Sequence, residues 1–202
     1  MTKQSTDYEL LTTPDPRLRR KSTKVHEIDD EVRDIVAKMN RACIDWEKTH
    51  EHELSAAMAA PQLGFNRRII VVREDMSDNA NANFIALINP EVIKTEGKID
   101  YDYEGCLSVP TIYGKVPRPS KARIKATLLD GAEVRLKPAG FLARTLLHEI
   151  DHLDGILFID HIKDDPQAFY RLDDKGDLIP LDYEKHIKGN KALFPDDDDD
   201  EA

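Results

Sequence analysis

The stretch GFLARTLLHEIDHLDG, residues 140–155, decides the expected fold. Its apolar residues recur at the three- and four-residue steps of a helix that buries one face, and Gly155 stands where a glycine commonly ends a helix. A helix is therefore predicted over Gly140–Asp154. Because this segment also contains the pattern HEIDH, the helix is expected to lie at the centre of the molecule.

The HEIDH pattern, from His148 to His152, indicates a metal site. Four-residue spacing places both imidazoles on one face of the helix, one turn apart, where they can bind the same ion. Glu149 lies between them and can reach a water molecule at that ion. Such an arrangement is typical of metal-dependent hydrolases.

A catalytic metal of this kind needs a third protein ligand. In metzincins a histidine follows three residues after the glycine of the motif, but that position is Phe158. In gluzincins a helical glutamate follows about twenty residues later, where this chain has loop-like sequence at 171–176. Upstream, EGCLS at 104–108 comes directly after a predicted strand, and Cys106 can supply a thiolate. A Cys-His-His site is therefore expected.

A second long helix is predicted over Asp29–Lys48, where apolar residues again recur at helical steps. Cys43 lies on the apolar stripe of this helix, so we expect it to be a small buried side chain rather than a ligand. The small and apolar segment Leu54–Gly64 follows. A hairpin turn is expected at Asp130-Gly131, a dipeptide favoured in tight turns.

The middle of the chain has the alternation and residue types of β-strands. Strands are predicted at Arg68–Val72, Phe84–Asn89, Glu91–Thr95, Lys98–Tyr103, Ala122–Leu129, Ala132–Leu136 and Ile156–Ile159. The order helix, many strands, helix differs from regular βαβ alternation. It predicts an α+β single domain in which mixed or antiparallel sheets pack around the central HEIDH helix.

Composition supports one domain in a reducing compartment. With 202 residues and 40% hydrophobic content, the chain can bury one sizeable core. Two cysteines provide no disulfide framework, which fits a cytoplasmic protein. No apolar run approaches the ~20 residues of a membrane span, and the amino terminus lacks the apolar region of a signal peptide.

The charge is acidic and concentrated at the carboxyl end. The net charge is −10, and six acids at 196–201 leave −4 for the rest of the chain. Direct nucleic-acid binding is not expected, since it depends on a broad Lys/Arg surface. We expect a catalytic domain over 1–189 and a disordered acidic tail over 190–202, because the tail cannot bury enough apolar surface to offset its ordering entropy.

Three linked motifs resemble those of the peptide deformylases. The third motif of that family appears as HEIDHLDG at 148–155, and the second as EGCLS at 104–108. The first motif, normally GxGxAAPQ, appears as SAAMAAPQ at 55–62. The similarity extends over about Tyr8–Asp165, and three motifs in the family's order are far more specific than HEIDH alone.

The resemblance implies hydrolysis of the N-formyl group from the amino-terminal formyl-methionine of newly made polypeptides, with release of formate. Cys106, His148 and His152 would bind one divalent ion. The resemblance implies Fe(II), with Zn, Ni or Co as substitutes, whereas the donor chemistry alone suggests zinc. The expected partners are formyl-methionyl nascent peptides in the cytoplasm.

The resemblance also implies roles for residues around the metal. Glu149 would act as general base and then pass the proton to the leaving amine. The side-chain amide of Gln62 and the backbone N–H of Leu107 would stabilise the oxyanion. The residues expected to contact the substrate are Ala57, Met58, Glu104 and Arg144.

The sequence departs from the family at three positions. Ser55 and Ala57 replace glycines of the first motif, where a side chain could crowd the substrate and a positive φ would be strained. Leu147 stands where the family has glutamine, which removes a polar contact beside the metal. These departures leave open a deformylase-like protein that binds metal and peptide with weak turnover. A metallopeptidase acting on unformylated peptides is disfavoured by the missing protease ligand.

A docking element for the ribosome is not expected. Some family members use a long carboxyl-terminal helix for this purpose, whereas the helical segment Asp182–Lys188 is short and an acidic tail follows it.

Overall fold

The structure is a computed structural model that describes residues 7–49, 55–75 and 82–195. Its elements in chain order are η1 (Pro16–Arg19), α1 (Asp30–Thr49), β1 (Ala57–Ala59), η2 (Ala60–Leu63), β2 (Ile69–Arg73), β3 (Phe84–Cys106), β4 (Val109–Thr127), β5 (Glu133–Leu136), α2 (Gly140–Leu153), η3 (Phe158–His161), β6 (Phe169–Leu172), β7 (Leu178–Pro180) and α3 (Tyr183–His186).

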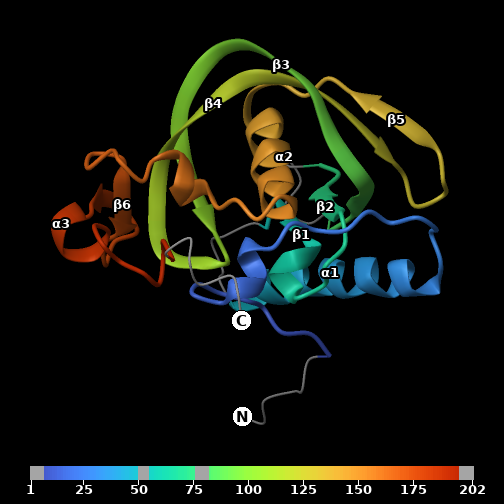
Figure 1. The fold of residues 1–202 in the computed structure, drawn as a ribbon, viewed down its shortest axis with the longest axis horizontal. Coiled ribbons are helices and arrows are strands. Elements are labelled where there is room, and N and C mark those ends of the chain that lie inside the picture. The colour runs from blue at the N-terminus through green and yellow to red at the C-terminus, as the bar shows by residue number, and fades with distance from the viewer. Residues whose placement is uncertain (1–6, 50–54, 76–81, 196–202) are drawn as a thin grey trace.

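The strands in the described part of the chain form one antiparallel sheet. Its order is β1-β2-β3-β4-β6-β7, and β5 pairs with β4 outside this path. The long strands β3 and β4 arch over α2, which carries the HEIDH pattern (Figure 1). The predicted α+β class with a central HEIDH helix is confirmed, and the sheet is antiparallel.

The two long helices cover opposite faces of β2. Ile69 and Val71 belong to the core cluster of α1, whereas Ile70 and Val72 belong to the cluster of α2. Burial on both faces explains why β2 is a continuous apolar run rather than an alternating one. The observed bounds of α1 and α2 lie within a residue of those predicted at each end. Cys43 is fully buried, as expected, and burial raises the pKa of its thiol to about 12.

Three predicted strands form a single one, β3. Its pairing with β4 shifts register at Ile88/Glu91, Val92/Lys94 and Glu96/Ile99. The first shift coincides with Pro90, which has no N–H for the ladder, and the third with Gly97 at φ 84°. The sheet absorbs these interruptions as bulges, so the strand continues through them.

The predicted strand at Ile156–Ile159 is wrong. Phe158 begins the 3-10 turn η3, and the Asp160 carboxylate accepts a hydrogen bond from the Leu157 N–H at 2.7 Å. Consecutive side chains from Leu157 to Ile159 are all buried, as they are in β2, so an apolar run alone does not distinguish a buried strand from this turn.

The carboxyl-terminal part of the described chain packs beyond the predicted boundary at Gly189. Leu193 is buried in a third core cluster with Phe158 and Phe169, and its carbonyl accepts a hydrogen bond from Arg19 at 2.6 Å. The packed region therefore continues past Gly189, and residues 196–202, which include the six acids, lie outside the described residues. Among the described helices, none is long and apolar enough to cross a membrane.

Gly155 ends α2 in a conformation that only glycine adopts without strain. Its φ is +76°, and a Cβ added there would lie 2.2 Å from the backbone oxygen of Arg19. Gly176 has φ +83° but has no atom within 4 Å of an added Cβ. The two glycines therefore separate backbone strain from steric exclusion.

We predict that Gly155→Ala lowers the free energy of unfolding by at least about 2 kcal/mol more than Gly176→Ala. In both variants an alanine in the left-handed conformation costs about 1 kcal/mol. Gly155→Ala also pushes the backbone at residue 155 away from that of Arg19. Chemical denaturation of the metal-free proteins measures the difference. Equal losses in the two variants would contradict the close approach of Gly155 to η1.

Candidate metal centre and active site

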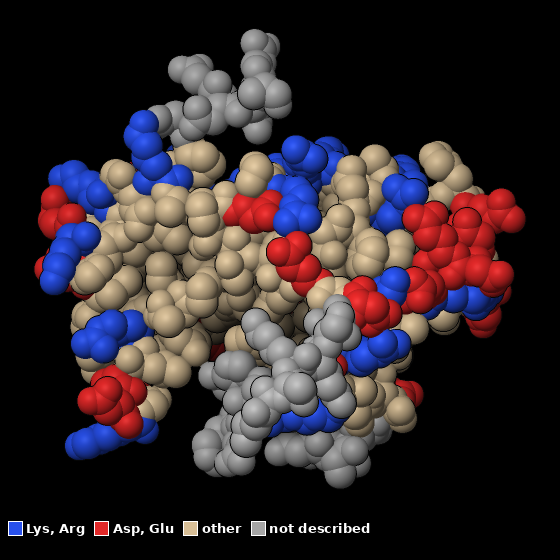
Figure 2. All heavy atoms as spheres, turned by 90° about the horizontal axis from the view of Figure 1, so that it is seen from below, with Lys and Arg blue, Asp and Glu red and all other residues tan. Residues whose placement is uncertain are grey.

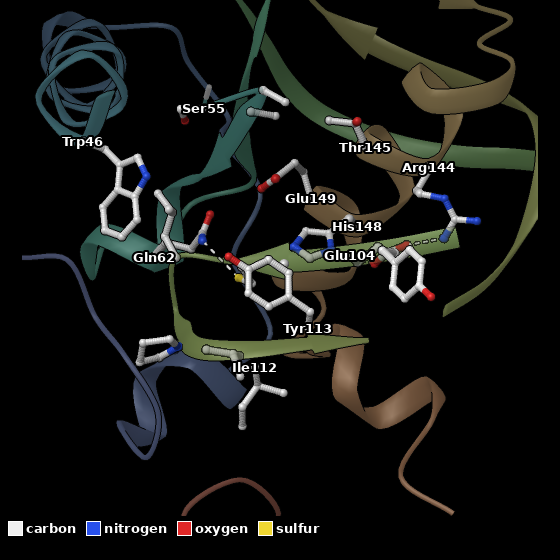
Figure 3. A pocket seen from close by; sticks show the side chains of 18 of the residues that line it. Trp46, Ser55, Gln62, Glu104, Ile112, Tyr113, Arg144, Thr145, His148 and Glu149 are labelled. Carbon is white, nitrogen blue, oxygen red and sulfur yellow. Dashed lines mark hydrogen bonds and ion pairs between the residues drawn. The ribbon is translucent and has the colours of Figure 1, made fainter. Parts of the chain in front are cut away.

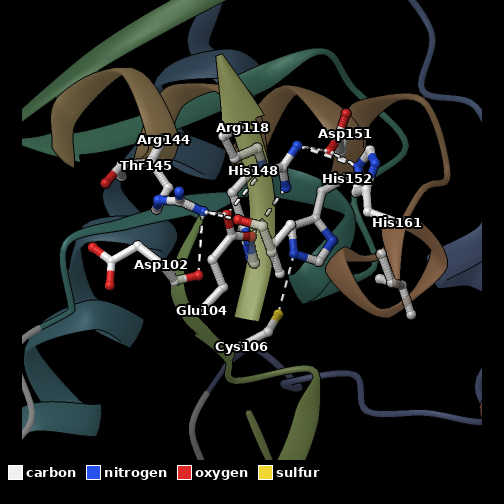
Figure 4. Close-up of polar contacts among 12 residues, drawn as sticks. Asp102, Glu104, Cys106, Arg118, Arg144, Thr145, His148, Asp151, His152 and His161 are labelled. Atoms are coloured by element: carbon white, nitrogen blue, oxygen red, sulfur yellow. Dashed lines mark hydrogen bonds and ion pairs between the residues drawn. The ribbon is translucent and has the colours of Figure 1, made fainter. Parts of the chain in front are cut away.

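Three donors converge between the end of β3 and α2. The ligand atoms of Cys106, His148 and His152 all lie within 4.8 Å of one another. Cys106 Sγ is 3.2 Å from His152 Nε2 (Figure 4). Two donors of a tetrahedral ion with these ligand types lie about 3.5 Å apart. The donor set therefore fits one divalent ion. These are the three residues that the sequence predicts to share a site, and the structure brings their donor atoms together.

His148 is held in place by a carboxylate. Its Nδ1 lies 2.9 Å from Glu104 Oε2, so the other ring nitrogen is left to the metal side. A carboxylate behind a ligating imidazole fixes the tautomer and the ring plane and makes the nitrogen a better donor. Burial lowers the pKa of the second imidazole, His152, so this ring is kept neutral as a ligand must be.

Glu104 also binds two guanidinium groups. Arg118 donates to both of its oxygens, at 2.9 and 3.0 Å, and Arg144 Nη1 donates at 2.8 Å (Figure 4). The carboxylate is only 4% exposed. Burial disfavours its charge, but hydrogen bonds from His148 and Arg118 outweigh burial and hold the pKa of Glu104 well below its usual range.

The cluster continues into the helix and the arch. Arg118 also pairs with Asp151, the fourth residue of HEIDH, and Asp151 Oδ2 lies 2.7 Å from His161 Nε2. Arg144 Nη1 donates to the carbonyl of Val116 on β4 at 2.8 Å. Its Nη2 donates to a β3 carbonyl, that of Asp100, at the same distance. The cluster thus ties α2 to both strands of the arch.

Sequence reasoning missed part of this cluster. It gave no role to Arg118, Asp151 or His161. The signal that would find Arg118 is the β3–β4 register. This register pairs Arg118 with Asp100 and so places Arg118 beside β3. That register is not visible from the separate strands.

Glu149 lies at the pocket without an internal partner. Its side chain is buried, it lines the pocket, and Oε2 accepts no hydrogen bond among the described residues. Burial raises the pKa of Glu149 to about 7. A carboxylate whose pKa is near neutrality is suited to accept and return a proton.

Gln62 points its amide toward the metal ligands. Its Oε1 accepts from the Ala59 N–H at 2.8 Å, which fixes the orientation of the side chain. Its Nε2 lies 3.6 Å from Cys106 Sγ (Figure 3). The same nitrogen lies 3.2 Å from Ser108 Oγ. Leu107 follows Cys106 and also lines the pocket. Both expected oxyanion donors therefore lie at the site.

The four residues expected to contact the substrate lie differently at the pocket. Ala57 lines the pocket. The Met58 side chain is 1% exposed and packs in the α1 cluster, so it does not reach the pocket. Glu104 and Arg144 border the pocket, but their charged atoms are bound to each other and to the arch. Contact with a substrate was expected of all four residues, and it stays a prediction for each of them.

The departures from the family motifs are accommodated. Neither Ser55 nor Ala57 has a positive φ, so the expected backbone strain does not arise. Leu147 is buried in the α2 cluster beside residues such as Leu146 and Ile150. An apolar side chain suits that position, and the polar contact expected of glutamine is absent.

A pocket of about 560 Å³ opens beside the three donors. Its aromatic lining residues are Trp46, Tyr103, Tyr113 and Phe141. β1 forms one border and is the edge strand of the sheet. The Ala56 carbonyl accepts from Arg73 on β2, so by antiparallel alternation the N–H and C=O of Ala57 face the outer edge. This edge can pair with an extended peptide.

The burial of Glu104 generates a prediction. We expect Glu104→Gln to lower the free energy of unfolding by about 3–5 kcal/mol, because Arg144 loses its buried carboxylate and Arg118 keeps only Asp151. We also expect metal affinity to fall by about 10- to 100-fold, because His148 loses its carboxylate. Denaturation of the metal-free protein and competition with a chelator measure the two effects.

The matched control is Glu96→Gln. Glu96 also pairs with two cations, Arg123 and Lys94, but at the surface, where such pairs contribute little. It should leave both measurements nearly unchanged. Equal effects of the two substitutions would contradict the account of Glu104.

Comparison with known proteins gives the family. The family described as Polypeptide deformylase matches residues 7–168. The peptide deformylase of Thermomicrobium roseum is 44% identical over 158 residues, covering 77% of this chain and 85% of that protein. That of Halothermothrix orenii is 45% identical over 148 residues, covering 73% and 88%. The crystal structure of a peptide deformylase from Synechococcus elongatus in complex with actinonin aligns with a TM-score of 0.67 and 32% identity, over 80% of this chain and 81% of that one. The present chain therefore belongs to the polypeptide deformylase family.

Proposed function

We propose that this chain deformylates peptides in the pocket beside Cys106, His148 and His152, with Glu149 as its general base. Membership of the family makes the chain a hydrolase that removes the N-formyl group from nascent peptides, and implies one catalytic metal ion. The observation that carries the assignment to this pocket is the convergence of one thiolate and two imidazoles around the buried, unpartnered Glu149.

Fe(II) is the metal that we propose, on the strength of the family resemblance, with Zn, Ni or Co as substitutes. A divalent ion bound here would lower the pKa of a water molecule and polarise the formyl carbonyl. Among the described residues, Cys106, His148 and His152 would hold it, and three protein ligands leave room at the ion for water and substrate.

The chain's own residues supply the proton transfer and the charge stabilisation. Glu149 takes a proton from water as the oxygen of that water bonds to the formyl carbon. The C–N bond then breaks, and Glu149 passes the proton to the leaving nitrogen, so that the products are formate and a free amino terminus. The Gln62 amide and the Leu107 N–H donate hydrogen bonds to the oxygen that gains negative charge.

The substrate would lie along the outer edge of β1. The N–H and C=O of Ala57 can pair with an extended peptide and direct its formyl end toward Glu149. The methionine side chain would enter the apolar part of the pocket beside Phe141 and Thr145. The Ala57 methyl group narrows this groove, so the substrate backbone must pass over it.

The proposal also covers the partners of the enzyme and its location in the cell. On the face in Figure 2, basic side chains are scattered among acidic ones and form no continuous basic surface, and we infer that the chain does not bind nucleic acid directly. α3 has four residues, too few for a long docking helix, so we infer no ribosome docking by that route. We infer a cytoplasmic location because Cys106 must remain a reduced thiol to bind metal.

The test is formate release from formyl-Met-Ala-Ser by protein loaded anaerobically with Fe(II), and in parallel with Ni(II) or Co(II). Glu149→Gln should lower the rate by about 10²–10⁴-fold, because it removes the proton acceptor while keeping the shape of the side chain. Its metal content should match that of the wild-type protein.

Two controls separate the alternatives. Unformylated Met-Ala-Ser should remain intact, whereas its cleavage would indicate a metallopeptidase. Full metal loading without formate release would contradict the proposed activity and favour a deformylase-like binding protein.

A further inference from the structure

The strands β6 and β7 form a hairpin that lies outside the part of the chain matched by the family, which ends at Ala168. The hairpin extends the catalytic sheet directly. Tyr170 pairs with Tyr113 and Phe169 pairs with Gly114, and the Lys115 N–H donates to the Ala168 carbonyl at 2.8 Å. An element beyond the family match is therefore joined to the strand that borders the pocket.

Tyr170 packs against a wall of the pocket. Its ring meets that of Tyr103 edge to face, with centroids 5.0 Å apart and an interplanar angle of 89°. A hydrogen bond with Tyr103, together with partial burial, raises the pKa of the Tyr170 hydroxyl. Tyr103 and Tyr113 both line the pocket, whereas Tyr170 stands behind them. The contact thus links the hairpin to the surface that a substrate would touch.

The second tyrosine of the wall is packed over Gly105. A Cβ added to Gly105 would lie 2.7 Å from Tyr113 Cε1, which shows how closely the ring covers this glycine. Gly105 precedes the proposed metal ligand Cys106, and Tyr113 and Gln62 both line the pocket (Figure 3). Tyr113 therefore stands next to the reacting end of the pocket.

The hairpin is firmly anchored on its other face. Phe169, the neighbour of Tyr170, is 1% exposed in the third core cluster and lies 5.9 Å from the Tyr183 ring. In contrast, Tyr103 is 42% exposed and Phe141, at the same pocket, is 59% exposed. An exposed aromatic rim on a fixed support is suited to pack against apolar side chains.

We propose that Tyr170 is a positioning residue that holds Tyr103, and that Tyr103 with Tyr113 forms a subsite for an apolar or aromatic side chain downstream of the substrate methionine. The hairpin β6–β7 is then part of the substrate groove. This inference rests on the proposed function for its ligand, the formylated peptide.

Three peptides test it: formyl-Met-Ala-Ala, formyl-Met-Phe-Ala and formyl-Met-Ala-Phe. The wild-type enzyme should show a KM about three- to tenfold lower for one of the phenylalanine peptides, the range expected from an aromatic contact. Tyr170→Ala should remove this preference and leave kcat for formyl-Met-Ala-Ala within about twofold. Tyr170→Phe should keep the preference, because the ring contact remains. Leu172→Ala, on the same strand and outside the pocket lining, is the matched control.

Binding measured without turnover separates the subsite from catalysis. Trp46 is the only tryptophan of the chain and lines the pocket, so its fluorescence should report peptide binding. In a metal-loaded Glu149→Gln background, the same preference and its loss in Tyr170→Ala are expected. Absence of formate release by the wild-type enzyme would overturn the proposed function, while this assay would still decide on the subsite.

Three results would overturn the inference. The first is a wild-type enzyme that binds all three peptides equally. The second is a preference that survives in Tyr170→Ala. The third is a uniform loss across the three peptides, which would assign Tyr170 to folding alone. If Tyr170→Ala does not fold, Tyr103→Ala replaces it and should remove the preference, and adding Tyr170→Phe should then change nothing further.

Discussion

Glu104 is a buried carboxylate that accepts hydrogen bonds from two arginines and lies against His148, one of the three proposed metal ligands. Its partners come from different elements: Arg118 from β4, Arg144 and His148 from α2. Buried charges are costly unless each is compensated. Here Glu104 and Asp151 balance Arg118 and Arg144, so the cluster is neutral before the histidines are counted. The arch of β3 and β4 is therefore fixed over α2, which carries two of the three proposed metal ligands.

This constraint explains how the donors are preorganised. Cys106 lies two residues after Glu104 on β3, and His148 lies four residues after Arg144 on α2. When Glu104 binds Arg144, it therefore also sets the distance between the thiolate and the imidazole. Glu149 is excluded from the cluster and keeps an unpartnered oxygen at the pocket. In this segment of α2, the carboxylate of Asp151 is therefore bound to Arg118, whereas the carboxylate of Glu149 has an oxygen available to exchange a proton.

The parts of the molecule that depend on short-range pattern could be predicted from the sequence. α1 and α2 follow from helical periodicity, and the three candidate donors that the structure brings together follow from the spacing of HEIDH and from EGCLS. The parts that depend on long-range pairing could not. Arg118 lies near Glu104 because of the register between the long strands β3 and β4. Pairing with β4 also keeps β3 continuous through Pro90 and Gly97. The apolar run at Ile156–Ile159 leads into a 3-10 turn because the Asp160 carboxylate accepts a hydrogen bond from the Leu157 N–H, which a strand would use for pairing. The apolar content of the run does not reveal this hydrogen bond.

X-ray absorption of the zinc-loaded protein tests the central claim most directly, because it reads the ligands of the metal without reference to activity. The account predicts one sulfur at about 2.3 Å and two nitrogens at about 2.0–2.1 Å, from Cys106, His148 and His152. A first shell of oxygen and nitrogen alone, with no sulfur, would contradict it.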